Sequence, residues 1–399
     1  MSDTPLLSIL IPTKNREEFT VKVIHHILEI NDPRLQLVIQ DNSDTNNLEY
    51  LLTDCLEDSR MKYYYHAKVL SFVDNFSLGI SKCDGDYVTI IGDDDGINPF
   101  IIDIAAWAHK NGIEAITPSL PLVYFWPESG VHSKNDCGRL NIAEISCKVS
   151  FYDPAKEVVK LLKNGCQNYL TFNLAKAYHG MIKRSVLEEI KNRTGHFIGG
   201  LSPDIYLSIA ASLLVEKVLI IDYPLTISGI CKKSGSSDSA TGKHTGALEQ
   251  APHFRGHSNY EWSDLVPPFY CVETIWADSA LATVKDLKIK NLIKYFNPYV
   301  LAAHCLKLHP QFKTVILDNL SKNHKILQRS VSKKFYLFAG FLTGPLKTRI
   351  NAISNQLLHK KSTETFSDIP DIQKASEKIQ ANIGKYEEVI MNNLQAINQ

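Results

Sequence analysis

The chain has 399 residues and a mass of 44.9 kDa, and its 44% hydrophobic and 22% charged residues are ordinary for a soluble globular protein of two or three structural units. Its 8 cysteines are scattered and form no C-x-x-C pair, so we expect reduced thiols rather than a zinc site or a disulfide framework. Because the apolar runs are short, we expect neither a signal peptide nor a helix of the ~20 residues that span a bilayer.

Equal numbers of basic and acidic residues, 43 of each, conceal an uneven distribution. Residues 281–361 contain 15 Lys and Arg against 2 Asp and Glu, which suggests an anionic surface as partner. Within this segment, residues 331–350 place aromatic and aliphatic side chains between basic ones, which is typical of a segment in the headgroup region of an anionic membrane; a core helix with basic flanks is the alternative. No nucleic-acid-binding motif is present, so nucleic acid is not expected as a partner.

Strands and helices alternate over the first 120 residues. Short apolar, β-branched runs predict strands at 6–12, 35–39, 61–65, 87–91 and 114–117. Apolar residues at helical spacing predict helices after the first strand and at 72–81 and 99–110. This alternation is typical of an α/β fold with a doubly wound, mostly parallel sheet.

The middle of the chain mixes both kinds of element. We expect strands of an added hairpin at 122–126 and 139–149, a helix at 154–164, a strand at 179–183, a helix at 185–192 with Ser185 as N-cap, a helix at 203–214 that begins at Pro203, and a strand at 217–221. Residues 234–246 have too few apolar side chains to pack and predict a mobile loop.

From residue 266 onward the pattern is helical. A basic helical region, 266–361, is predicted to contain helices at 274–285, 288–309 and 312–323. In the C-terminal segment 362–399, isoleucines recur at near-heptad intervals between 371 and 397, which predicts a helix docked on the body. The alternative, a short coiled coil, would make the chain a homo-oligomer.

Three consecutive aspartates, Asp93, Asp94 and Asp95, follow the predicted strand 87–91. In an open α/β sheet, ligands bind beyond the carboxyl ends of the strands, and neighbouring carboxylates repel each other unless a cation neutralises them. Because side chains alternate at a strand end, we expect Asp93 and Asp95 to share a side and to bind Mg²⁺ or Mn²⁺, with Asp94 pointing away. The alternative is a solvated acidic turn.

Four segments occur in a characteristic order: Ser8-Ile9-Leu10-Ile11-Pro12-Thr13-Lys14-Asn15-Arg16, Val38-Ile39-Gln40-Asp41-Asn42-Ser43, Gly85-Asp86-Tyr87 and Gly92-Asp93-Asp94-Asp95. Together they resemble the nucleotide-binding half of family 2 glycosyltransferases with the GT-A fold, over about residues 6–120. The resemblance implies a GT-A domain over 1–265, with the acceptor bound by 121–265. It also implies a nucleotide-sugar donor, Mn²⁺ or Mg²⁺, and transfer with inversion at the anomeric carbon.

The resemblance assigns roles to individual residues. Arg16, in the turn after the first strand, would face a phosphate. Asp41 would accept a hydrogen bond from a pyrimidine N–H, which favours a UDP-sugar, although an Asx turn is the alternative. Asn75 would reach the nucleotide unless it lies on a solvated helix face. The residues assigned to the nucleotide and donor are Pro12, Thr13, Asn15, Arg16, Asp41, Asn75, Asp93, Asp94 and Lys243.

The catalytic base is assigned to Asp204. Family members carry an Asp at the start of a late helix, where it deprotonates the acceptor hydroxyl, and Asp204 is the matching position. Pro203 stands where Glu is usual, and an acid favoured by the helix dipole is the alternative. Aromatic side chains suited to acceptor selection, or alternatively to core packing, are Trp126, Tyr169, Phe172, Tyr178 and Trp262.

Two residues of the glycine-flanked loop 234–246 complete the expected site. Lys243 would neutralise phosphate charge, and His244 would complete the metal shell when the loop closes over the donor. The alternative for both is an ordinary surface position, and His253 is the second choice for the metal.

The expected function is therefore a metal-dependent, inverting glycosyltransferase. It would move a hexose or N-acetylhexosamine to a saccharide or lipid-linked oligosaccharide in the synthesis of a bacterial surface polysaccharide such as O-antigen or capsule, in the cytoplasm at the inner face of the cytoplasmic membrane. One alternative is a catalytically inactive, membrane-associated scaffold. A sugar-1-phosphate nucleotidyltransferase is disfavoured, because residues 13–16 lack the glycine-rich loop that such enzymes carry.

Overall fold

The computed structural model describes residues 4–120, 122–131, 137–233, 245–248, 254, 260–326 and 363–397. Within these ranges, none of the helices combines the length and the apolar character that crossing a membrane requires.

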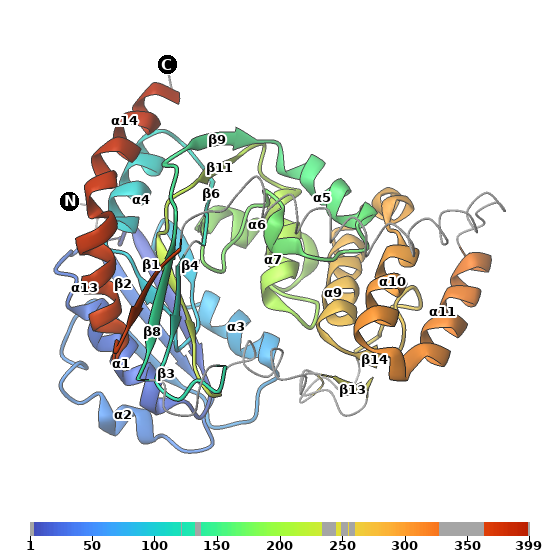
Figure 1. The fold of residues 1–399 in the computed structure, drawn as a ribbon, viewed down its shortest axis with the longest axis horizontal. Coiled ribbons are helices and arrows are strands. Elements are labelled where there is room, and N and C mark those ends of the chain that lie inside the picture. Colours follow the sequence, from blue (N-terminus) through green and yellow to red (C-terminus); the bar gives the residue numbers. More distant parts are fainter. Residues whose placement is uncertain are drawn as a thin grey trace.

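A large, mostly parallel sheet of eight strands forms the centre of the molecule, in the order β3-β2-β1-β4-β10-β6-β11-β9 (Figure 1). Only β10 and β9 run against the other six strands. The strands are β1 (Leu7–Thr13), β2 (Leu35–Asp41), β3 (Met61–Tyr65), β4 (Tyr87–Ile90), β6 (Ala115–Pro118), β9 (Val149–Tyr152), β10 (Met181–Lys183) and β11 (Val218–Ile221). The α/β class predicted from the sequence is confirmed.

Helices cover both faces of this sheet. Successive side chains of a strand point to opposite faces, so neighbouring residues of one strand belong to different cores. Ile9 of β1 belongs to the core under α1 (Glu17–Leu28), α4 (Ile101–Lys110) and the C-terminal helices. Leu10, its neighbour, belongs to the core under α3 (Phe72–Ile80), α6 (Arg184–Thr194) and α7 (Pro203–Ser212). The predicted N-cap Ser185 is wrong: α6 begins one residue earlier, after Lys183. A short helix, α2 (Asn47–Leu51), follows β2.

A second sheet lies beside the first, in the order β15-β8-β7-β12-β5. Its strands are β5 (Gly96–Ile97), β7 (Leu122–Phe125), β8 (Arg139–Ala143), β12 (Thr226–Ile230) and β15 (Thr363–Ser367). The predicted hairpin is confirmed, since β7 and β8 are antiparallel, but its second strand ends at Ala143 and the following strand, β9, joins the large sheet. Because β12 pairs with β5, its end lies against the aspartates that precede β5.

A helical region adjoins the sheet domain, and its helix α9 packs on α7 (Figure 1). It contains α9 (Val272–Asp286), η4 (Lys290–Tyr295), α10 (Pro298–Leu308), η5 (Pro310–Phe312) and α11 (Lys313–Ile326), and nearby are β13 (Gly246–Ala247), β14 (Phe269–Tyr270), α5 (Pro154–Lys163) and η1 (Tyr169–Thr171). The single helix predicted at 288–309 is wrong. Asn297 caps a new helix by accepting a hydrogen bond from the Tyr299 N–H, and Pro298 occupies the first turn.

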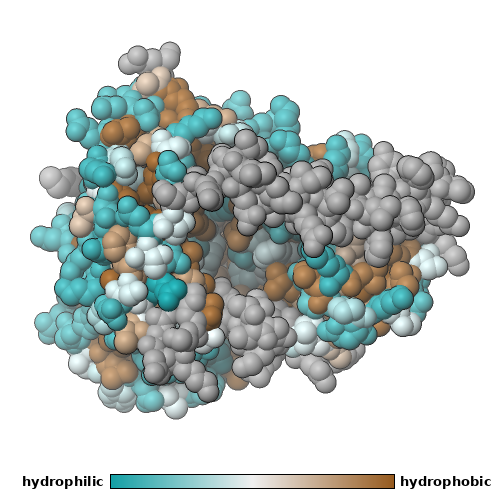
Figure 2. Space-filling view, in the orientation of Figure 1, coloured by the Kyte–Doolittle hydropathy of each residue, from teal (hydrophilic) through white to brown (hydrophobic). Residues whose placement is uncertain are grey.

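Apolar surface is visible on the helical region in the space-filling view (Figure 2). Leu308 and Leu317, with exposed fractions of 51% and 44%, belong to this region. The segment 331–350, for which membrane contact is predicted, lies outside the described residues.

The C-terminal segment returns to the sheet domain. Strand β15 extends the second sheet, and α13 (Ile372–Ile383), η6 (Gly384–Tyr386) and α14 (Glu387–Ile397) follow. The single helix predicted at 371–397 is interrupted at Gly384, but its docking is confirmed, because Ile379 and Ile390 are buried in the core shared with α1. The isoleucine face is therefore used within the chain, and a homo-oligomer remains a prediction.

Candidate active site

The three aspartates occupy a turn beyond the carboxyl end of β4, where open α/β sheets bind ligands. The exposed fractions are 2% for Asp93, 5% for Asp94 and 2% for Asp95, so the alternative of a solvated turn is wrong. The expected alternation of the three side chains is also not observed. The strand ends at Ile90, and the turn directs Asp93 and Asp94 toward the same guanidinium group.

Arg16 supplies this guanidinium group from the N-cap position of α1. Its Nη1 lies 2.6 Å from Asp93 Oδ1 and its Nη2 lies 3.1 Å from Asp94 Oδ2. Nη2 also donates to Cys231 Sγ at 2.8 Å. Arg16 is thus the counter-ion of two aspartates, and its contact with a donor phosphate remains a prediction.

Asp95 is held by a different set of donors. Its Oδ1 accepts from the backbone N–H of Gly229 at 2.7 Å, and its Oδ2 accepts from the backbone N–H of Gly92 at 2.6 Å and from the Tyr178 hydroxyl at 3.1 Å. His179 Nε2 lies 3.3 Å from the same Oδ2. This carboxylate is therefore fixed in position by four groups.

Thr13 and Asn75 line the same corner of the sheet. Thr13 Oγ1 donates to Asp93 Oδ2 at 2.6 Å, and Asn75 Nδ2 donates to the Thr13 carbonyl at 3.3 Å. Asn75 Oδ1 is buried without a hydrogen-bond donor, which is costly in a folded protein. Asn75 is thus not on a solvated helix face, and its amide oxygen can accept an N–H or O–H from a ligand.

Asp41 is completely buried at the end of β2. Its Oδ1 accepts from the backbone N–H of Ser43 at 2.8 Å, which is the Asx turn considered as the alternative, and its Oδ2 accepts from the Tyr63 hydroxyl at 2.8 Å. Asn15 faces the same loop, with its backbone N–H donating to Ser43 Oγ at 2.8 Å. Pro12 is a buried residue inside β1 and does not end that strand. Recognition of the nucleotide's pyrimidine ring by these residues remains a prediction.

Asp204 lies in the first turn of α7, after Pro203. Its Oδ2 accepts from the Tyr169 hydroxyl at 2.6 Å, and its Oδ1 accepts from the Ser202 hydroxyl. Two hydroxyl donors therefore fix the direction of the carboxylate. Its role as a base remains a prediction.

Tyr178 connects the neighbourhood of Asp204 with that of Asp95. Burial, together with the negative charges of Asp95, Asp94 and Asp204, raises the pKa of Tyr178 well above its ordinary value. Burial and the charge of Asp204, with a smaller contribution from Tyr178, likewise raise the pKa of Tyr169. The fold thus brings the candidate base and the aspartate turn into one electrostatic environment.

Burial and the nearby cations act in opposite directions on the pKa values of the three aspartates. Burial raises the pKa of Asp94 to about 7, although the charge of Arg16 opposes this shift, and burial raises the pKa of Asp93 as well. Burial also acts to raise the pKa of Asp95, but the charge and hydrogen bond of His179 outweigh it and hold this pKa below the ordinary value. Three carboxylates therefore face one guanidinium and one imidazole.

This arrangement suits the divalent cation implied by the family resemblance. Carboxylate oxygens are the ligands that Mg²⁺ and Mn²⁺ prefer. Asp93 Oδ1 is buried without an aligned hydrogen bond, although it lies 2.6 Å from an Arg16 nitrogen, so it can still accept a ligand. Asp93 and Asp95 would hold the cation.

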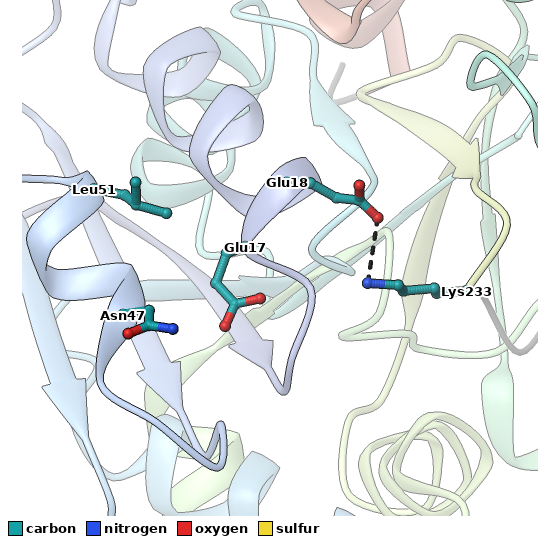
Figure 3. A pocket seen from close by; sticks show the side chains of 5 residues that line it. All are labelled: Glu17, Glu18, Asn47, Leu51 and Lys233. Atoms are coloured by element: carbon teal, nitrogen blue, oxygen red, sulfur yellow. Dashed lines mark ion pairs between the residues drawn. The ribbon is translucent and has the colours of Figure 1, made fainter.

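A pocket of about 440 Å³ is lined by Glu17, Glu18, Asn47, Leu51 and Lys233 (Figure 3). In Figure 3, Glu17 points toward Asn47, and Glu18 forms an ion pair with Lys233 at 3.3 Å. None of the predicted site residues that the structure describes lines this pocket, and two carboxylates at its wall repel a diphosphate. We therefore place the site at the aspartate turn. The predicted residues Lys243, His244 and His253 lie outside the described residues.

Sequence reasoning missed the groups that position Asp94 and Asp95. His179 adopts a left-handed backbone conformation, with φ of 58°, that few non-glycine residues show, and its Nδ1 lies 2.8 Å from Thr226 Oγ1. A Cβ atom on Gly229 would lie 1.7 Å from the Asp94 carbonyl oxygen, so only glycine fits. An isolated glycine within a strand is a signal of such close approach.

Residues 8–136 match the family model described as Glycosyl transferase family 2. The putative colanic acid biosynthesis glycosyl transferase WcaA of Escherichia coli (strain K12) is 29% identical over 112 residues, which are 28% of this chain and 39% of WcaA. Glycosyltransferase GlyG of Streptococcus pneumoniae serotype 4 is 24% identical over 99 residues, 25% of this chain and 33% of GlyG. An uncharacterized glycosyltransferase of Rickettsia bellii is 27% identical over 89 residues, 22% of this chain and 13% of that protein.

The chain thus matches less than half the length of each of these relatives. Among solved structures, residues 1–349 of S. aureus TarS in complex with UDP-GlcNAc give a TM-score of 0.42 at 11% identity, covering 98% of this chain and 90% of that chain. Residues 8–136 of this chain are thus similar to family 2 glycosyltransferases.

Proposed function

We propose that this chain is a metal-dependent, inverting glycosyltransferase that uses a nucleotide diphosphate sugar, preferably a UDP-hexose or UDP-N-acetylhexosamine. The observation that carries the proposal is the approach of Asp204 and the buried aspartate turn to the same tyrosine, Tyr178. A base and a cation site must lie on either side of one anomeric carbon, and this pairing supports assigning those roles to Asp204 and to the aspartate turn. The family match over residues 8–136 supports the reaction class.

The chemistry follows from the positions of the carboxylates. The acceptor oxygen attacks the anomeric carbon while the bond from this carbon to the diphosphate oxygen breaks, and the nucleotide diphosphate leaves with the electron pair. Asp204 accepts the proton of the attacking hydroxyl. Tyr169 and Ser202 hold the Asp204 carboxylate in one direction, as a positioned base requires.

A divalent cation held by Asp93 and Asp95 would stabilise the negative charge of the leaving diphosphate as a Lewis acid. In this structure the positive charge of Arg16 pairs with the carboxylates of Asp93 and Asp94. Its guanidinium group is also suited to contact a phosphate beside them. Asn75 offers a buried acceptor for the nucleotide, and Asp41 offers one for the N–H of a uracil ring.

The acceptor would be a hydroxyl of a saccharide or of a lipid-linked oligosaccharide in surface polysaccharide synthesis, and the similarity to WcaA, a putative colanic acid biosynthesis glycosyl transferase, supports this choice. The excess of basic residues in 281–361 supports an encounter with an anionic membrane at its cytoplasmic face. Co-sedimentation with vesicles containing anionic lipid tests this part, and equal binding to neutral vesicles would contradict it.

The decisive experiment measures donor binding and transfer separately. We expect calorimetry with a panel of UDP-, GDP- and dTDP-sugars to show UDP-sugar binding that requires Mn²⁺ or Mg²⁺ and disappears in Asp95→Asn. Asp204→Asn should retain this binding but lose about 10²- to 10⁴-fold in the transfer rate, the usual contribution of a general base. An unchanged transfer rate in Asp204→Asn would refute the assignment of Asp204 as the catalytic base. Donor binding without any turnover in the parent protein would favour the alternative of an inactive scaffold.

A further inference from the structure

Three metal-ligating side chains meet in the helical region, apart from the aspartate turn, and a further thiol, that of Cys305, lies beside one of them. Cys271 is the N-cap of α9 and Glu273 lies in its first turn, whereas Cys305 lies in α10 and His309 follows its last residue. The ligand atoms of Cys271, Glu273 and His309 all lie within 4.8 Å of one another, with 3.0 Å between His309 Nε2 and Glu273 Oε2. The thiol of Cys305 forms a hydrogen bond with that of Cys271.

The types and spacings of these residues are those of a transition-metal site. Thiolates and imidazoles are the usual ligands of structural Zn²⁺, and a carboxylate can complete a tetrahedral set. Cys305 and His309 are separated by four positions, the helical spacing that directs two side chains to one point. Cys271 and Cys305 are fully buried, and the side chains of Glu273 and His309 are 16% exposed. We propose that Cys271, Glu273 and His309 bind one thiophilic divalent cation, Zn²⁺ by preference, with the Cys305 thiol beside the site.

The surroundings of the cluster favour a bound metal over an arrangement in which these side chains are hydrogen-bonded only to one another. The cluster lies within an apolar core, where Phe269 stacks on Phe312 with ring centroids 4.3 Å apart and packs edge-on against the His309 ring. Polar groups in such a core are costly unless each is fully paired, and one bound cation would pair Cys271, Glu273 and His309 at once.

Outer contacts of the kind that orient metal ligands are also present. Thr274 Oγ1 lies 3.4 Å from Cys271 Sγ and accepts the Cys271 backbone N–H at 3.0 Å. Gln167 Nε2 donates to the Glu273 backbone carbonyl at 3.2 Å. These bonds hold the first turn of α9 in the orientation that presents Cys271 and Glu273 together.

The proposed cation would join α9 to the end of α10. Helix α9 packs on α7, which carries Asp204, and Trp276 of α9 packs edge-on against Tyr169, the residue that donates to Asp204. The metal would thus stabilise the helical wall behind the candidate base, without contact to the donor. This role is structural and does not depend on the proposed transferase activity.

The test is metal analysis of the full chain, purified without a polyhistidine tag or a chelator. We expect one zinc per chain by plasma mass spectrometry and, after exchange into Co²⁺, an intense near-ultraviolet thiolate-to-cobalt band. Cys271→Ser combined with Cys305→Ser should remove both signals. The matched control Cys83→Ser, which removes a buried thiol from another core, should retain both.

Two further single variants test the zinc site if the double cysteine variant does not fold. His309→Gln should weaken zinc retention against a colorimetric chelator by at least ~10-fold, the smallest loss that even an outer-sphere partner causes. Asp95→Asn should leave the zinc content unchanged, so a failure of the proposed function is distinguishable from a failure of this site. A chain that retains no zinc after equilibration with a small excess, or that is isolated with a Cys271–Cys305 disulfide, would overturn the proposal.

Discussion

Arg16 is expected to be the residue on which the folded aspartate turn depends most strongly when no metal is bound. Arg16→Met keeps the length of the side chain but removes the charge that pairs with Asp93 at 2.6 Å and with Asp94 at 3.1 Å. Removing one partner of a buried ion pair costs about 3–5 kcal/mol, because the remaining charge is left unpaired in the interior. We expect a loss of this size in the free energy of unfolding at neutral to alkaline pH.

The size of this loss should depend on pH with a defined sign. The pKa of Asp94 is about 7 in the fold, against an ordinary value of 3.8, so the folded state binds the proton more tightly than the unfolded chain does. The stability that this protonation contributes is fully present below the ordinary pKa and is lost as the pH rises through about 7. A protonated, neutral Asp94 forms no ion pair with the guanidinium group. The loss in the free energy of unfolding caused by Arg16→Met should therefore be smaller near pH 5 than near pH 8.

Urea unfolding, followed by tryptophan fluorescence, measures both the loss of stability and its dependence on pH. The same titration with Mn²⁺ present measures how far a bound cation restores the stability. Saturation of a site at 100 times its dissociation constant stabilises the folded state by about 2.7 kcal/mol, so Mn²⁺ should restore part of the loss. Arg34→Met is the matched control, because Arg34 pairs with Asp32 and Asp103 at the surface and should cost at most ~1 kcal/mol. A loss in Arg16→Met no larger than in this control, or equal at both pH values, would refute the reasoning.

Two further substitutions test the geometry of the site. Tyr169→Phe removes the hydroxyl that orients Asp204, and we expect a lower transfer rate with unchanged donor affinity in calorimetry; a loss of affinity alone would contradict a positioning role. Gly229→Ala forces a Cβ to within 1.7 Å of the Asp94 carbonyl oxygen and should lower the free energy of unfolding by more than about 2 kcal/mol, since backbone must move. Gly384→Ala, which meets only the mobile end of a glutamine side chain, is its control and should be close to neutral in the same urea titration.

The order of strands and helices in the large sheet could be predicted because the signals are local. Each strand from β1 to β4 is a short apolar run between polar turns, and the apolar residues of α1 recur at helical spacing. The break between η4 and α10 was missed because apolar periodicity continues across it, although Pro298 signals a helix start. Strand β15 was missed because it is mostly exposed and polar.

The candidate site could be predicted only in part, because its parts come from distant segments. The aspartates are adjacent in sequence and were recognised, but Asp95 accepts a hydrogen bond from Gly229, 134 positions away. A backbone N–H has no side-chain signature, so this contact requires the structure. Likewise, Cys271 and Cys305 show no C-x-x-C spacing and meet only because α9 and α10 pack together.

The C-terminal segment also bears on how the protein is made. Ile372 lies so close to Gly96, the residue after Asp95, that a Cβ there would be 2.8 Å from it, and β15 pairs along the whole of β8. Residues 363–397 leave the ribosome after the rest of the described chain. The nascent sheet domain therefore lacks these contacts beside its acidic turn until residues 363–397 have left the ribosome.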